Sequence, residues 1–98
     1  MTHRVTFRLS DGERSFAILD GGTLLGAALR ARLPLARSCR GVAVCAACRV
    51  RVVDGAEHLD APTAAERALT AREPLRPGER YACQARVRGP VTITTTYW

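Results

Sequence analysis

Four cysteines, all that the chain contains, are the residues best suited to do chemistry. Three of them follow the pattern C-x5-C-x2-C at Cys39, Cys45 and Cys48, and 34 residues separate the last of these from Cys83. Four thiolates grouped in this way favour a metal centre. Structural zinc usually takes two C-x2-C pairs, and here only Cys45 and Cys48 form one. An iron–sulfur cluster is therefore favoured over zinc, and disulfides or free thiols are the remaining alternatives.

The segment around the first three cysteines is made of small residues. A [2Fe–2S] cluster needs four thiolates, two for each iron, and backbone N–H groups that approach its sulfur atoms. Bulky side chains would obstruct that approach. The predicted cluster environment consists of small residues, one candidate hydroxyl donor and one cation: Gly41, Ala43, Ala46, Ala47, Ser38 and Arg40.

Hydrophobic alternation and turn signals predict the elements that position this segment. The expected strands are residues 2–9, 14–19, 49–53 and 91–97, with an extended segment over 80–87. A helix is expected over residues 24–32, capped by Thr23 and stopped by Pro34. A second, short helix is expected over 63–71, where Thr63 and Glu66 match a capping box. The pattern alone predicts an α+β fold with one sheet layer and one crossing helix.

Size and charge narrow the possible functions. The 98 residues suffice for a single domain, 1–98, and no apolar run is long enough to cross a membrane. No leader precedes the first predicted strand, so a cytoplasmic location is expected. The net charge is +6 and all 15 basic residues are arginine. These arginines are dispersed and the chain has few aromatic residues, which argues against nucleic-acid binding.

Two stretches resemble the [2Fe–2S] ferredoxin family. Residues 38–50, SCRGVAVCAACRV, look like the family's cluster loop, and residues 80–84, RYACQ, look like its second cysteine motif. The start of the first predicted helix, LLGAA over residues 24–28, and the approach LPL over 33–35 match as well. The five-residue gap between the first two cysteines is nearer the adrenodoxin and bacterial vertebrate-type branch than the plant-type branch, whose gap is four.

The resemblance implies a β-grasp fold, with a mixed sheet of four to five strands, one crossing helix and a short second helix. It implies one [2Fe–2S] cluster held by Cys39, Cys45, Cys48 and Cys83. By motif position, Cys39 and Cys45 hold the outer iron, and Cys48 and Cys83 the inner one.

The chain departs from relatives in two respects. Val44 and Ala46 stand where the family often has glycine, and the protein is basic where ferredoxins are commonly acidic. The family's acidic docking region corresponds to residues 54–73, where acids are mixed with arginines. The docking candidates are of both signs: Asp60, Glu66, Glu73, Arg37 and Arg40. For Glu66 a helix cap is the favoured alternative. His3 and His58 are expected to be ordinary surface residues, and Trp98 is expected to cap a sheet edge or cover the core.

The function that follows is one-electron transfer. We expect a soluble, monomeric carrier that takes electrons from a ferredoxin reductase and passes them to an oxygenase or another redox enzyme. No catalytic dyad, nucleophile or phosphate loop is visible in the sequence, so an enzyme is not expected. Two alternatives stay open: a ferredoxin-like subunit or iron–sulfur assembly component bound stably to one partner, and a zinc-bound structural module.

Overall fold

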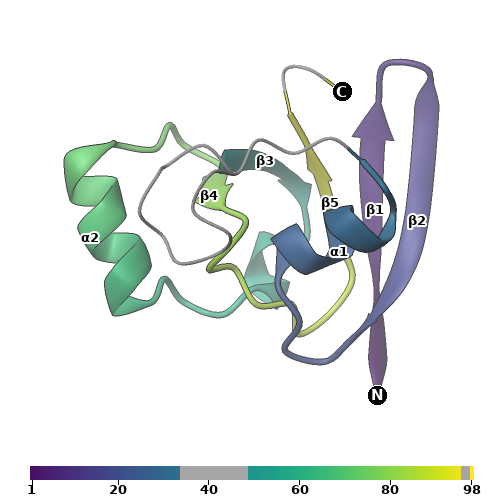
Figure 1. The fold of residues 1–98 in the computed structure, drawn as a ribbon, viewed down its shortest axis with the longest axis horizontal. Coiled ribbons are helices and arrows are strands. Elements are labelled where there is room, and N and C mark those ends of the chain that lie inside the picture. Colours follow the sequence, from purple (N-terminus) through teal and green to yellow (C-terminus); the bar gives the residue numbers. More distant parts are fainter. Residues whose placement is uncertain (34–48, 96–97) are drawn as a thin grey trace.

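The first two strands form a hairpin at one edge of the sheet. The computed structural model describes residues 1–33, 49–95 and 98 (Figure 1). β1 (Thr2–Leu9) and β2 (Gly12–Leu19) pair antiparallel along their whole length, with Val5 opposite Phe16. Val5 and Phe7 are fully buried, as their alternation with polar residues predicts. The hairpin confirms both predicted strands, although β2 begins two residues earlier than expected.

A five-stranded mixed sheet forms the body of the molecule. The remaining strands are β3 (Arg49–Asp54), β4 (Glu79–Tyr81) and β5 (Val91–Thr94). The strand order is β2-β1-β5-β3-β4, in which β1 and β5 run parallel and the other pairs are antiparallel. This arrangement confirms the predicted α+β class and the β-grasp architecture. A bulge at β3 lies between Val52 and Asp54.

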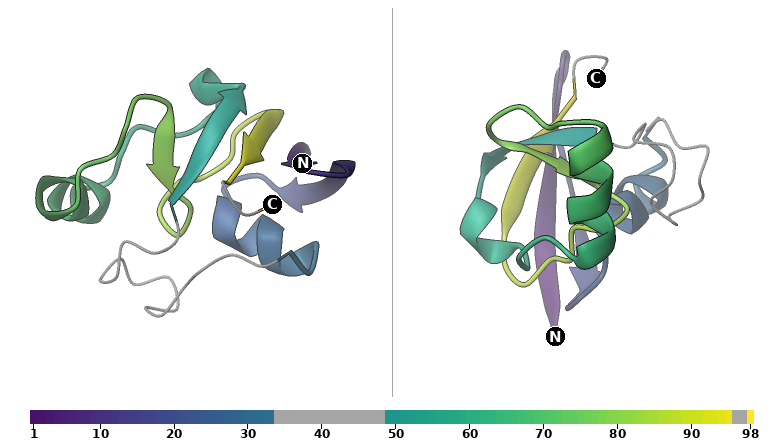
Figure 2. Two further views of the ribbon diagram at one scale, coloured as in Figure 1. Left: turned by 90° about the horizontal axis from the view of Figure 1, so that it is seen from above. Right: turned by 90° about the vertical axis from the view of Figure 1, so that its left-hand side faces the viewer.

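Two helices lie at different places on this sheet. α1 (Leu24–Arg30) crosses beside β1 and β2, whereas α2 (Ala64–Arg72) stands beyond β4, at the opposite end of the sheet from β2 (Figures 1 and 2). A single 3-10 turn, Ala56–His58, follows β3. The buried core lies between α1 and the sheet and includes Leu24, Ala28 and Ile93. Neither α1 nor α2 is long and apolar enough to cross a membrane, and this holds for the described residues as a whole.

The helix α1 ends two residues earlier than predicted, in a tight turn. The amide of Arg32 donates to the carbonyl of Leu29 at 3.1 Å, and the amide of Leu33 donates to that of Ala28 at 3.0 Å. This pairing is a Schellman motif, whose turn residue adopts the left-handed conformation and is usually glycine. Here that residue is Arg32, with φ of 58°. The non-glycine residue costs about 1 kcal/mol at this position.

Arg32→Gly is therefore expected to stabilise the fold. The gain should approach about 1 kcal/mol, reduced by the greater freedom of glycine in the unfolded chain. The denaturant midpoints of the variant and the wild type measure this gain. Arg30→Gly is the matched control, because it removes the same charge from the right-handed last turn of α1. That control should destabilise the protein, and a similar loss for Arg32→Gly would contradict the expectation.

The segment after β4 differs from the prediction. An extended chain is expected over residues 80–87, but β4 ends at Tyr81 and the chain turns at once. The amides of Gln84 and Ala85 both donate to the Tyr81 carbonyl, at 3.0 and 3.2 Å. Further along, Arg86 and Val87 form isolated bridges with Thr23 and Leu59, and none of these four residues belongs to a strand of the sheet. The turn is stabilised by α1, whose Leu25 and Leu24 amides donate to the carbonyls of Ala82 and Ala85, and both alanines are fully buried.

Candidate metal centre

The tight turn after β4 carries Cys83, the one candidate ligand that the structure describes. This cysteine is buried, with only 6% of its surface exposed. The backbone on either side is fixed by α1, since the amide of Leu25 donates to the Ala82 carbonyl and that of Leu24 to the Ala85 carbonyl, both at 3.0 Å. The two amides belong to the first turn of the helix, where backbone donors lack partners within the helix. The N-terminus of α1 and the Cys83 turn therefore hold each other in place.

Cys83 lines an open hollow of about 370 Å³ between α1 and the start of α2. One wall is apolar, formed by Leu25 and Leu29 of α1, and the other carries Thr63 and Gln84. The side-chain NH₂ group of Gln84 donates to the Cys83 sulfur, with 3.9 Å between its nitrogen and the sulfur. A thiolate that accepts a hydrogen bond beside an apolar wall suits a soft metal centre such as an iron–sulfur cluster.

The orientation of Gln84 is set from α2. The hydroxyl of Thr63 donates to the Gln84 side-chain oxygen at 3.0 Å and accepts from the Glu66 amide at 3.0 Å. Thr63 is thus the N-cap of α2, as predicted, and it also turns the NH₂ group of Gln84 toward the sulfur. Sequence reasoning missed this second role, and the only local signal for it is the place of Gln84 in the second cysteine motif.

The other predicted ligands and loop residues lie outside the described residues. They are the segment's cysteines, its small residues and its cations: Cys39, Cys45, Cys48, Ser38, Arg40, Gly41, Ala43, Ala46, Ala47 and Arg37. Within the described ranges, no three potential metal-ligating side chains come together, and the ligand set proposed from the sequence includes three cysteines of that segment. The segment rejoins the described chain at Arg49, which pairs with Tyr81, two residues before Cys83.

A buried ion pair anchors β4 to α2. Glu66 is 1% exposed, and both of its oxygens accept hydrogen bonds from Arg80 at 2.8 Å. One of these oxygens also accepts from the Tyr81 amide at 3.2 Å. Arg80 donates in addition to the Asp60 carbonyl at 3.1 Å. All of the polar groups named in this cluster have hydrogen-bond partners. The cluster therefore holds β4, the strand that leads into the Cys83 turn.

Two predictions for Glu66 are wrong as a result. A carboxylate this deeply buried offers nothing to a docking partner, so Glu66 is not a docking residue. It does not complete a capping box either, because its side chain points to Arg80 and not back to the start of α2. The physical reason is charge: Arg80 is only 16% exposed, and an enclosed guanidinium requires a carboxylate partner.

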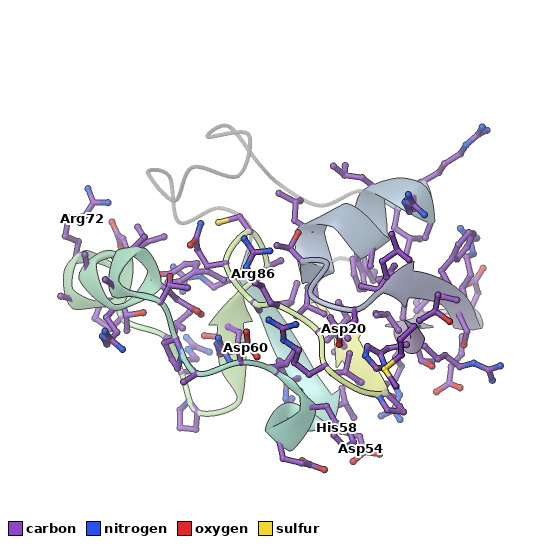
Figure 3. The ribbon with its side chains drawn as sticks, turned by 90° about the horizontal axis from the view of Figure 1, so that it is seen from below. Asp20, Asp54, His58, Asp60, Arg72 and Arg86 are labelled. Carbon is purple, nitrogen blue, oxygen red and sulfur yellow. The ribbon has the colours of Figure 1, made fainter. Side chains whose placement is uncertain are left out.

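The second docking candidate, Asp60, is engaged on the surface. Arg88 donates to both of its carboxylate oxygens, at 2.9 and 3.0 Å, and to Asp20 at 2.9 Å. Asp20 is also bonded to His3 at 2.7 Å. The hydrogen bond from His3 is the main cause that lowers the pKa of Asp20, and that from Arg88 lowers the pKa of Asp60. The pKa of Arg88 is raised in turn. Figure 3 shows Asp20 and Asp60 on neighbouring segments.

Removing Arg88 should therefore alter the response of stability to pH. Both aspartates have folded-state pKa values below the ordinary 3.8, so their contribution is present above that value and is lost as the pH falls through the lowered values. Arg88→Gln is expected to melt below the wild type at pH 7 and to converge with it in acid, as the pH falls through the lowered pKa values of the two aspartates. Thermal midpoints across this range measure the difference. Arg4→Gln, at an exposed site, is the control, and a gap that persisted in acid would contradict the expectation.

The remaining candidates occupy varied environments. Glu73 is exposed at the end of α2, where its carbonyl accepts from the Tyr81 hydroxyl, so its docking role stays a prediction. His58 bonds the Pro90 carbonyl at 2.5 Å. Trp98 packs edge-on against Phe7, with ring centroids 5.6 Å apart. These contacts account for the histidine and the tryptophan structurally.

One contact was not foreseen: Arg49 lies over the ring of Tyr81, 5.9 Å from its centre.

Fold and centre together define a ferredoxin-type electron-transfer domain. The family model described as "2Fe-2S iron-sulfur cluster binding domain" matches residues 7–88, and the chain belongs to that family. Its cofactor is a single [2Fe–2S] cluster, and the residues around Cys83 fit such a group.

Similar proteins fall into two kinds, free-standing and fused. A ferredoxin from Rhodopseudomonas palustris HaA2 is 28% identical with a TM-score of 0.73, over 94% of each chain. Putidaredoxin, solved in a covalent complex with putidaredoxin reductase, is 25% identical with a TM-score of 0.71, over 93% of this chain and 95% of that one. One component of the Na(+)-translocating NADH-quinone reductase of Chlamydia caviae is 32% identical over 89% of this chain. The chain spans about a fifth of the length of the curated relatives it matches.

Proposed function

We propose that this protein is a soluble one-electron carrier of the cytoplasm, a single domain over residues 1–98 that works as a monomer. It takes electrons from a ferredoxin reductase and passes them to an oxygenase or a similar redox enzyme. Cys39, Cys45, Cys48 and Cys83 are the proposed ligands. The observation that carries the proposal is the position of Cys83, whose thiol lines a half-apolar hollow from a turn that the first two amides of α1 hold.

The bound cluster supplies reversible uptake of one electron. The chain supplies a rigid and partly dry site for it. Leu25 and Leu29 reduce contact of the hollow with water, and the hydrogen bond from Gln84 stabilises negative charge on the Cys83 sulfur. The buried Glu66–Arg80 pair fixes the strand that precedes the turn.

The second candidate function is that of a module bound stably to one redox enzyme. The observation that favours it is the relation to the Na(+)-translocating NADH-quinone reductase, in which a domain like this one forms about a fifth of a longer chain. Gel filtration of native extract separates the two cases, since a free carrier elutes at the size of the chain and a bound module elutes with its enzyme.

A redox titration of the purified protein tests electron transfer itself. We expect a coloured protein that bleaches with dithionite and takes up one electron per chain, with two irons and two sulfides bound. A colourless protein that holds zinc would overturn the proposal, and so would a coloured protein that exchanges electrons with no acceptor.

A further inference from the structure

Helix α1 departs from ordinary helix chemistry at two positions. Gly26 lies inside the helix, where alanine is the more stable residue. Among the described residues, an added Cβ would meet only the Thr23 hydroxyl oxygen at 3.4 Å, so packing within this part of the chain does not demand glycine there. Arg32 is the reverse case: it is a residue with a side chain at a left-handed position that suits glycine. Departures of this kind occur where function outweighs stability.

Gly26 has no side chain, and so it forms a low point on the surface of α1, between two hollows. The outward side of α1 consists of Gly26, Leu29 and Arg30, at spacings of three and four residues. On one side lies the 370 Å³ hollow that Cys83 lines, and on the other lies a smaller hollow of about 180 Å³ toward β2. Thr23 and Gly26 line both hollows. A partner seated at Gly26 would thus lie against the rim of the hollow that Cys83 also lines.

The surroundings of this low point are apolar and basic. Phe16 is 38% exposed and Leu29 is 43% exposed, although both are large hydrophobic residues. Arg30 and the Arg32 turn lie at the end of α1, and Arg14 is held there by its bond to the Ala31 carbonyl at 3.2 Å. We call this surface the α1 face, and it comprises Arg14, Phe16, Gly26, Leu29, Arg30 and Arg32.

Carboxylates are missing from the lining of both hollows. Neither hollow is lined by an acidic side chain among the described residues, and residues 21–33 contain no acid at all. The nearest acid along the chain, Asp20, is already bonded to His3 and Arg88. An exposed apolar centre with a basic rim of this kind is complementary to an acidic protein surface.

We propose that the α1 face is the docking surface for an acidic redox protein, with the electron crossing at Gly26. This rests on the proposed function and names where that function meets its partner. Within the acidic region that the resemblance implied, Asp60 is paired with Arg88 and Glu66 is buried, which leaves Glu73 as the remaining acidic candidate. One electron leaves the reduced cluster and reduces the partner, and no other group is transferred.

Two haem proteins of opposite charge serve as probes: cytochrome b5, which is acidic, and cytochrome c, which is basic. Stopped flow measures how fast the reduced holoprotein reduces each of them at low salt. Arg30→Glu is expected to slow the reaction with cytochrome b5 by about tenfold, with an effect that shrinks as salt is added. The matched control is Arg4→Glu. Arg4 is exposed next to the core-facing Val5 and so lies on the opposite side of β1 from α1.

Gly26→Gln separates docking from stability. The side chain favours the helix and fills the low point, so the melting temperature should rise while the rate with cytochrome b5 falls. A purely structural role for Gly26 would not move the two measurements in opposite directions.

A cross-link maps the contact directly. The chain has no lysine, so a carbodiimide can join a partner's carboxylates only to the N-terminal amine. Arg30→Lys keeps the charge and introduces a unique reactive amine on the α1 face, and Arg4→Lys does so on the far side. We expect an adduct with cytochrome b5 from the first variant and little more than the wild-type background from the second.

The outcomes distinguish the two proposals. Failure of the wild type to reduce either cytochrome would overturn the proposed function. Reduction of both, with equal losses for Arg30→Glu and Arg4→Glu or equal cross-linking of the two lysine variants, would overturn the α1 face alone.

Discussion

Replacing Cys83 with serine is expected to leave a folded protein that cannot hold a full [2Fe–2S] cluster. Cys83 is the one candidate ligand outside the segment with the other three, and serine's harder oxygen is a poor substitute for a thiolate on iron. The fold should persist around the change, because Leu24 and Leu25 bond to backbone carbonyls on either side and not to the thiol. Visible absorption and the content of iron and sulfide measure the loss.

Ala82→Ser is the matched control for this change. It places the same hydroxyl group in the same turn, at a residue that is fully buried, and leaves the thiol in place. It should cost stability, through a buried hydroxyl, and keep the full cluster. A Cys83→Ser variant with an unaltered spectrum and two irons would show that Cys83 is not a ligand.

Breaking the buried ion pair is expected to be the most destabilising change in the scaffold. Glu66→Leu leaves the guanidinium of Arg80 enclosed without its partner and removes the acceptor of the Tyr81 amide. Loss of one partner from a buried pair costs about 3–5 kcal/mol. Because β4 leads into the Cys83 turn, the cluster should also be lost at a lower temperature. Denaturation midpoints, together with the visible absorbance on heating, follow both effects.

A double-mutant cycle separates the charge effect from packing. Glu66→Leu combined with Arg80→Met removes both charges, and it should recover much of the stability that either single change loses. The exposed pair Arg8–Glu13, 3.5 Å apart, provides the comparison. Removal of either partner there should cost less than about 1 kcal/mol. Equal effects at the two pairs would show that the burial of Glu66 contributes nothing to its strength.

The strands β1, β2, β3 and β5 and both helices could be predicted from the sequence because their patterns are local. Val5 and Phe7 alternate with polar residues, and that period is a direct consequence of strand geometry. Thr23 and Thr63 both precede apolar segments and both cap helices through their hydroxyl groups. The cysteine spacing was equally informative, since the family match confirms the [2Fe–2S] cofactor that it predicted.

Features that depend on distant partners could not be predicted in this way. The spacing of Thr63 and Glu66 is that of a capping box, but the partner of Glu66 lies 14 residues further on, at Arg80. Likewise, residues 80–87 alternate like a strand, yet the chain turns after Tyr81 because α1 supplies two amides there. No local sequence pattern predicts either partner. In the sequence Gly26 is only a weak point of its helix, and its place between two hollows requires the fold.

The position of β5 also governs the order in which the protein can fold. Among the described strands, β1 and β3 are joined only through β5, the last strand to be synthesised. The β1–β2 hairpin can form early, but the sheet stays in two halves until Val91–Thr94 enters between them. Pairing across such a long stretch of chain is slow compared with local pairing. Closure of the scaffold, and with it the enclosure of the Cys83 turn, is therefore a late event in the life of the nascent chain.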